Sequence, residues 1–141
     1  MKVHLKLTGF SDLLKDSIIE SVAEIIDVRY AYSLNEVWKN TYHRYYHQES
    51  HSHPNSELSF VIFMNDYSEN DAKFYFLNER NRVTSTTWLS LSEGMEDSIY
   101  IEPKKGDILF FPSHMLHGVS PHKSDTPRIT ISGNISVEQL T

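Results

Sequence analysis

The 141-residue chain contains no cysteine. This absence excludes disulfide bonds, thiolate zinc sites and a cysteine nucleophile, and it fits a protein that works in a reducing compartment. No apolar run approaches the roughly 20 residues that a membrane-spanning helix needs. The first residues also lack the apolar centre of a signal peptide. We therefore expect a cytoplasmic protein without a membrane partner.

Positive charge is scarce as well. Lysine and arginine total 13 against 19 acidic residues, which gives a formal net charge of -6, and the basic residues are scattered. A nucleic-acid partner is therefore not expected, because such proteins gather basic residues on one face. The length and the apolar fraction of 39% suit one globular domain. We expect this single domain to span residues 1–141, with a strand and helix in 1–36 and a β-core in 37–136.

The N-terminal part predicts a strand followed by a helix. Val3, Leu5 and Leu7 alternate with polar residues, which indicates a strand. A helix is expected from Ser11 to Asp27, with Ser11 or Asp12 as its N-cap. Its apolar residues recur at helical spacing and its acidic residues mark the opposite face. The apolar positions are Leu14, Ile18, Val22 and Ile25.

The remainder of the chain reads as short strands separated by polar turns. The expected strands are Val37–Tyr46, Leu58–Met64, Lys73–Leu77, Val83–Leu91, Ile99–Glu102, Asp107–Phe111, Gly118–Pro121 and Arg128–Ser136. Eight short strands predict a double-sheet jelly roll or a small barrel. Several strands are apolar on both faces, so one sheet needs a cover, and the amphipathic helix is the expected one. A subunit interface is the candidate cover for the rest, which leaves a homo-oligomer open.

A His-x-His pair, His51 and His53, is the strongest chemical signal in the sequence. In an extended segment the two imidazoles point the same way, because side chains alternate faces along a strand. His117 would add a third ring and complete a nitrogen-rich site for iron, zinc, copper or nickel. Alone, such a pair is more often solvated at the surface, but together with His117 and Arg128 it favours a metal site.

Arg128 opens the run Arg128-Ile129-Thr130-Ile131-Ser132, in which the polar residues share one face of a strand. A charged side chain on the cavity side of a strand needs an anionic partner. A small dicarboxylate held beside a metal would supply one. The alternative is a surface pair between Arg128 and Asp125 or a glutamate.

Several segments together carry a family resemblance. They are Trp38-x-Asn40, the run from His51 to Ser59, the run from Pro103 to Ser113, His117-x-Val119-x-Pro121, and Arg128-Ile129-x-Ile131-Ser132-x-Asn134. In this order and spacing, over roughly residues 38–136, the chain resembles the small phage and bacterial oxygenases that depend on 2-oxoglutarate and Fe(II). These proteins are similar to prolyl hydroxylases.

The resemblance implies a mainly β double-stranded β-helix, which is a cupin-like jelly roll, with the helix packed on one sheet. It implies a dioxygenase that uses Fe(II), 2-oxoglutarate and molecular oxygen to hydroxylate an unidentified substrate, for which a protein or amino-acid side chain is a family-level candidate. Arg128 would bind the far carboxylate of 2-oxoglutarate, because a guanidinium matches a carboxylate with two hydrogen bonds, and Thr130 would add a hydroxyl. The implied metal ligands, which with Arg128 form the catalytic set, are His51, His53 and His117.

One position departs from the usual pattern. Most of this superfamily has His-x-Asp or His-x-Glu where this chain has His51-Ser52-His53. A histidine there gives three neutral ligands and a more positive metal site. Glu57 remains open as a replacement for His53.

A cupin-type metalloenzyme that does not use 2-oxoglutarate is an alternative, and a metal-binding module without chemistry is another. The first cupin motif, His-x-His-x(3)-Glu, is matched by His51, His53 and Glu57. The second is matched in part by Gly106-x(5)-Pro112-x(4)-His117, although His114 and Pro121 replace its usual glycine and asparagine. Neither alternative gives Arg128 a role. The other histidines are expected to be structural or exposed; they are His4, His43, His47, His114 and His122.

Overall fold

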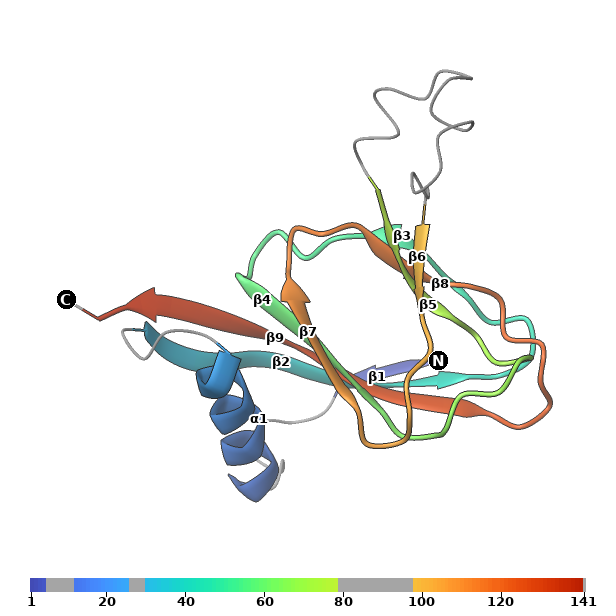
Figure 1. Ribbon diagram of the computed structural model, residues 1–141, viewed down its shortest axis with the longest axis horizontal. Helices are drawn as coiled ribbons and strands as arrows, with labels where there is room; N and C mark the ends of the chain where they lie inside the picture. Colours follow the sequence, from blue (N-terminus) through green and yellow to red (C-terminus); the bar gives the residue numbers. More distant parts are fainter. Residues whose placement is uncertain (5–11, 26–29, 79–97, 141) are drawn as a thin grey trace, which may run out of the picture.

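Two antiparallel sheets and one helix make up the fold (Figure 1). The computed structural model describes residues 1–4, 12–25, 30–78 and 98–140. Its elements are β1 (Lys2–His4), α1 (Asp12–Ile25), β2 (Tyr30–Tyr42), β3 (Gln48–His51), β4 (Leu58–Phe63), β5 (Phe74–Leu77), β6 (Ser98–Ile101), β7 (Ile108–Pro112), β8 (His117–Val119) and β9 (Arg128–Gln139). One sheet has the order β1-β2-β9-β4-β7 and the other has the order β3-β8-β5-β6. This confirms the expected mainly β, jelly-roll architecture.

The two sheets face each other across an aromatic core. Tyr42, Phe63 and Phe111 from the five-stranded sheet pack in one cluster with Phe74 and Phe76 from the four-stranded sheet. Because side chains alternate along a strand, the residues next to these in sequence point to the other face of the larger sheet, away from the core. The inner faces of both sheets are therefore available to build a cavity beside this core.

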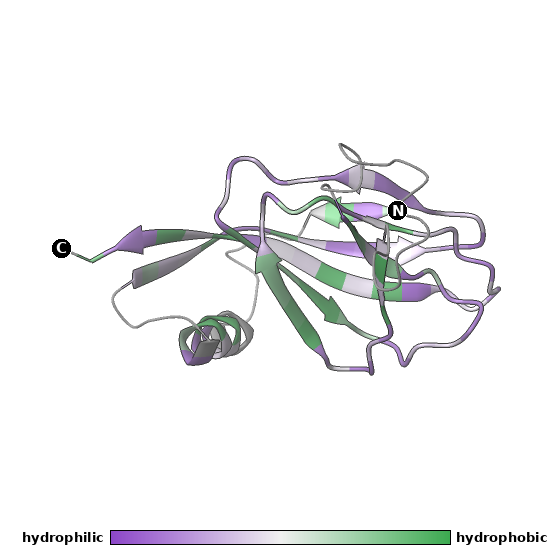
Figure 2. Cartoon of the chain, turned by 45° about the horizontal axis from the view of Figure 1, so that its top comes forward, coloured by the Kyte–Doolittle hydropathy of each residue, from purple (hydrophilic) through white to green (hydrophobic). Residues whose placement is uncertain are grey.

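Helix α1 covers the outer face of the five-stranded sheet, as the amphipathic pattern predicts. Ile18 and Val22, both buried, pack in a second apolar cluster with Val37, Phe60 and Ile135. Figure 2 shows this helix lying against the sheet on the side away from the four-stranded sheet. The predicted N-cap Ser11 lies outside the described residues, and no described helix is long and apolar enough to cross a membrane.

The predicted strand Val37–Tyr46 is wrong at both ends. β2 begins at Tyr30, because its first residues continue the ladder with β9 as far as the pair Tyr30 and Gln139. It ends at Tyr42, and a turn at residues 43–46 separates it from β3, which the sequence did not predict as a strand of its own. The predicted strand Val83–Leu91 lies outside the described residues.

Candidate active site

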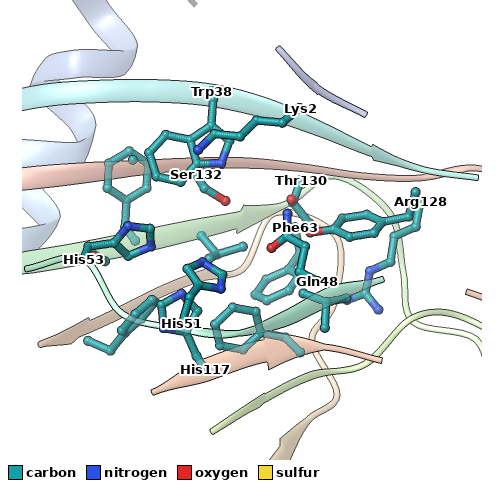
Figure 3. A pocket seen from close by; sticks show the side chains of 18 residues that line it. Lys2, Trp38, Gln48, His51, His53, Phe63, His117, Arg128, Thr130 and Ser132 are labelled. Atoms are coloured by element: carbon teal, nitrogen blue, oxygen red, sulfur yellow. The ribbon is translucent and has the colours of Figure 1, made fainter. Parts of the chain in front are cut away.

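Three histidines converge between the sheets (Figure 3). His51 ends β3 and lies opposite His117, the first residue of β8, in the antiparallel ladder. His53 follows two residues on, and its backbone N–H donates to the Ser113 carbonyl at 2.8 Å. Their ligand nitrogens all lie within 4.8 Å of one another. The structure thus brings together the three imidazoles that the sequence singled out.

Backbone contacts orient two of these rings. Nδ1 of His51 lies 2.8 Å from the Glu49 carbonyl, and Nδ1 of His117 lies 2.9 Å from the Met115 carbonyl. A carbonyl oxygen only accepts, so Nδ1 must carry the proton and donate in both rings. The Nε2 lone pair is then free in each ring, which is the arrangement found in most metal-binding histidines.

The surroundings of His53 and His117 favour the neutral form of both rings. His117 is buried, stacked on Phe74 at a ring separation of 5.4 Å and packed against Phe111. This burial lowers the pKa of His117 to about 4. The pKa of His53 is also lowered to about 4, first by burial and then by His51 and Lys2. Neutral imidazoles bind a metal near pH 7 without first losing a proton, so the donor set fits a divalent first-row ion.

Glu57 does not belong to this cluster. Its carboxylate accepts a hydrogen bond of 2.9 Å from the backbone N–H of Val137, and the three-histidine group does not include it. The first cupin motif is therefore incomplete in space. His43, His47 and His114 are exposed, as expected. His122 is fully buried and uses both ring nitrogens in contacts to the backbone.

A cavity extends from the histidines along the inner face of β9. The space between its lining side chains, counted together with the open solvent at its mouth, is about 520 Å³. Arg128, Thr130 and Ser132 line it from β9, as strand alternation predicts, and Figure 3 shows Arg128 at the end away from the histidines. The metal-ligand candidates and the arginine therefore belong to one cavity.

Arg128 is buried and forms no ion pair at contact distance with a described residue, although the Asp71 carboxylate acts on its charge from farther away. Only 4% of it is exposed, the Nη1 nitrogen donates to the Ala72 carbonyl, and the Nη2 nitrogen has no hydrogen-bond partner. Burial lowers its pKa, but a guanidinium keeps its charge. Among the described residues no carboxylate lies within 4.0 Å of it. The alternative pairing with Asp125 is wrong, since that carboxylate binds Arg44 at 2.8 Å. An orphaned buried donor on a cation fits an anionic ligand such as the far carboxylate of 2-oxoglutarate.

A polar network beside Arg128 was not predicted from the sequence. Asn40 donates to the hydroxyls of Thr130 and Ser132 at 3.3 Å each, and Gln48 donates to the Asn40 side-chain oxygen at 3.3 Å. The Tyr42 hydroxyl also shares a hydrogen bond with Thr130. The sequence signal for Asn40 is its position two residues from Tyr42 on a strand, which puts both on one face.

Two kinds of comparison identify the fold and the family. The structure resembles an oxidoreductase of the 2OG-Fe(II) oxygenase family from Burkholderia pseudomallei, with a TM-score of 0.66 and 15% identity over 89% of this chain. The chain spans only 55% of the length of that protein. It also resembles HygX from Streptomyces hygroscopicus, solved with iron bound, with a TM-score of 0.69 and 13% identity over 96% of this chain and 71% of HygX.

These structural likenesses establish a shared fold. In sequence, no curated protein matches the chain. A family model for 2OG-Fe(II) oxygenases matches residues 36–134, which is most of the chain and contains the three histidines and Arg128. The chain belongs to the 2OG-Fe(II) oxygenase family.

Proposed function

We propose that this chain is a 2-oxoglutarate- and Fe(II)-dependent dioxygenase that hydroxylates a substrate not yet identified. In this proposal the iron ligands are His51, His53 and His117, and Arg128 binds the far carboxylate of the co-substrate. The observation that supports this proposal most strongly concerns Arg128. Its buried guanidinium, with one unpaired nitrogen, lies in the same cavity as the three-histidine cluster. HygX, which shares the fold, has been solved with nickel and 2-oxoglutarate bound.

Residues in different parts of the cavity would have different roles in the proposed reaction. Three protein ligands leave coordination positions for other molecules. Bound Fe(II) supplies the activation of oxygen, which is coupled to oxidative decarboxylation of 2-oxoglutarate to succinate and carbon dioxide. Arg128 would orient the co-substrate, with Thr130 as a second contact to the same carboxylate. Phe74 and Phe111 beside His117 would keep bulk water from this side of the site.

The finer assignments belong to the same proposal. A protein or amino-acid side chain is the substrate class taken from the resemblance to prolyl hydroxylases. A cytoplasmic location is supported by the absence of cysteine. Two alternatives do not explain why the Arg128 guanidinium is buried with an unpaired nitrogen. They are a cupin-type enzyme that does not use 2-oxoglutarate and a binding module without chemistry.

Anaerobic titration with Fe(II) and then 2-oxoglutarate tests the proposal through the visible charge-transfer absorption of their chelate. The wild-type protein should give the band only when both are present. Arg128→Ala should still bind iron but need roughly ten- to a hundredfold more 2-oxoglutarate, because a hydrogen bond to a charged group contributes about 1.5–3 kcal/mol. Arg128→Lys should recover part of this loss, since the two-pronged geometry is gone.

Matched variants separate the two halves of the site. His117→Ala should lose iron while the exposed neighbour His114→Ala keeps it, as measured by metal content after gel filtration. Arg44→Ala, which removes an arginine paired at the surface with Asp125, should leave 2-oxoglutarate affinity unchanged. Unaltered 2-oxoglutarate affinity in Arg128→Ala would refute the proposed function.

A further inference from the structure

The cavity is lined by two cationic side chains and by no described acidic residue. Arg128 lies at one end and Lys2 lies at the other, beside Trp38 (Figure 3). A bound divalent metal would add two more positive charges, and His53 in place of the usual carboxylate ligand removes one negative charge. Because 2-oxoglutarate brings only two negative charges, the lining side chains, metal and co-substrate together would still carry a net positive charge. The Asp71 and Glu36 carboxylates, which act on Arg128 and His53, lie outside this lining.

Strand register directs Lys2 into this cavity. β1 pairs with β2 so that Lys2 lies opposite Asn40, whose side chain joins the buried network beneath the cavity. Directly paired residues of an antiparallel ladder point to the same face of the sheet. The Lys2 ammonium lies 4.0 Å from the centre of the Trp38 ring, a cation–π contact that holds it at the cavity wall.

The Lys2 ammonium has no acidic partner within 4.0 Å among the residues that the structure describes. The nearby acidic residue Glu36 lines an adjoining polar groove, which shares His53 with the cavity, and its carboxylate accepts from the Asn134 side chain at 3.3 Å. A cation beside a site for a divalent metal is electrostatically unfavourable. An anion bound between the two would turn this repulsion into attraction.

The far carboxylate of 2-oxoglutarate cannot serve Lys2 if Arg128 holds it at the opposite end of the cavity. We therefore propose that the primary substrate carries a carboxylate, which binds the Lys2 ammonium with Trp38 as the adjoining aromatic wall. This inference rests on the proposed function, because it names the substrate class of that same site. A substrate with a cationic group at this position would be rejected by the same charges.

Pairs of acids and their amides test this inference without turnover. The protein, tagged at its C-terminus to keep β1 intact, is loaded with Ni(II) and 2-oxoglutarate, and binding is measured by calorimetry. One set of probes contains N-acetyl amino acids and their amides, and the other contains capped peptides that differ by glutamate or glutamine. In at least one set the acid should bind about tenfold more tightly than its neutral partner. The set that shows this preference identifies the source of the carboxylate.

Variants assign the preference to Lys2. Lys2→Met should abolish it and Lys2→Arg should retain it, whereas Lys39→Met, which removes an exposed lysine outside the cavity, should have no effect. Each variant must still give the Fe(II) and 2-oxoglutarate absorption band, so that a lost co-substrate site is not mistaken for a lost substrate site. Equal binding of every acid and its amide would overturn the inference, and so would a preference that survives in Lys2→Met.

Discussion

His122 is a buried histidine outside the three-histidine cluster. Its Nδ1 accepts from the Ala72 backbone N–H at 3.0 Å, and its Nε2–H donates to the Thr126 carbonyl at 2.7 Å. The carbonyl of Ala72 is in turn the acceptor for Arg128. One imidazole therefore joins the segment that receives the guanidinium to the segment that leads into β9. We expect His122 to act as a positioning residue for Arg128.

His122→Phe should weaken 2-oxoglutarate binding several-fold and destabilise the protein by about 1–3 kcal/mol, because the buried N–H of Ala72 loses its hydrogen-bond acceptor. His122→Gln, which keeps an acceptor and a donor, should restore part of both. Urea unfolding and the 2-oxoglutarate titration measure the two effects on protein with full metal content. A loss of stability with unchanged 2-oxoglutarate affinity would mean that His122 supports only the fold.

The sequence indicated residues whose pattern lies in a short segment, and the family resemblance added His117. The sequence did not indicate which distant residues would be hydrogen-bond partners. His51 and His53 are two residues apart, and the pattern around Arg128 is contained in five consecutive residues. In contrast, Asn40 reaches Thr130 across 90 residues and His122 reaches Ala72 across 50. Such contacts follow from strand register, which alternation alone leaves undetermined.

At the scale of elements, the turn between β2 and β3 shows why one boundary was misplaced. Tyr45 has a φ of 70°, a backbone conformation that residues other than glycine adopt rarely, and its N–H donates to the His122 carbonyl. The Tyr46 N–H closes the turn on the His43 carbonyl at 2.9 Å. The run of tyrosines has high strand propensity and none of the usual turn residues, so tertiary hydrogen bonds decide the conformation.

The contact between α1 and the five-stranded sheet gives a prediction at the same scale. Ile18→Ala should reduce the free energy of unfolding by about 2–5 kcal/mol, because Ile18 is fully buried against the sheet. Glu20→Ala, on the exposed side of the helix, should change it by no more than about 0.5 kcal/mol. Urea unfolding followed by circular dichroism compares them.

Helix α1 lies on the face of the sheet opposite the cavity, so the Ile18→Ala substitution should change the stability of the protein and not its binding properties. Folded Ile18→Ala protein is expected to keep the wild-type metal content and 2-oxoglutarate affinity. A change in either, measured at a temperature where the variant is fully folded, would show that the helix also shapes the cavity.

At the scale of the whole molecule, the site exists only where the two sheets meet. β3, β8 and the residues after β3 supply the three histidines, whereas β9 of the other sheet supplies Arg128 and Thr130. Pairing of β3 with β8 therefore assembles the metal site, and sheet packing brings it to Arg128. Metal binding should in turn stabilise the β3–β8 pair. The aromatic core that holds the sheets together is also what buries His117.

This burial makes the stability of the metal-free protein sensitive to acid. Burial lowers the pKa of His53 and of His117 to about 4 in the folded state, against about 6.5 in the unfolded chain. Between these values the unfolded chain binds more protons, so stability is present above about pH 6.5 and is lost as the pH falls toward about 4. Each histidine contributes a slope of at most about 1.4 kcal/mol per pH unit.

Urea unfolding of metal-free protein from pH 7.5 to pH 4.5 measures this slope, and a variant isolates its source because carboxylates also titrate in the acid range. His117→Phe keeps a ring among the aromatic side chains and removes the proton acceptor, so its stability should fall less steeply than that of the wild type. His114→Ala, at an exposed position, should follow the wild-type slope. Parallel slopes for wild type and His117→Phe would show that acid destabilises the protein through other groups.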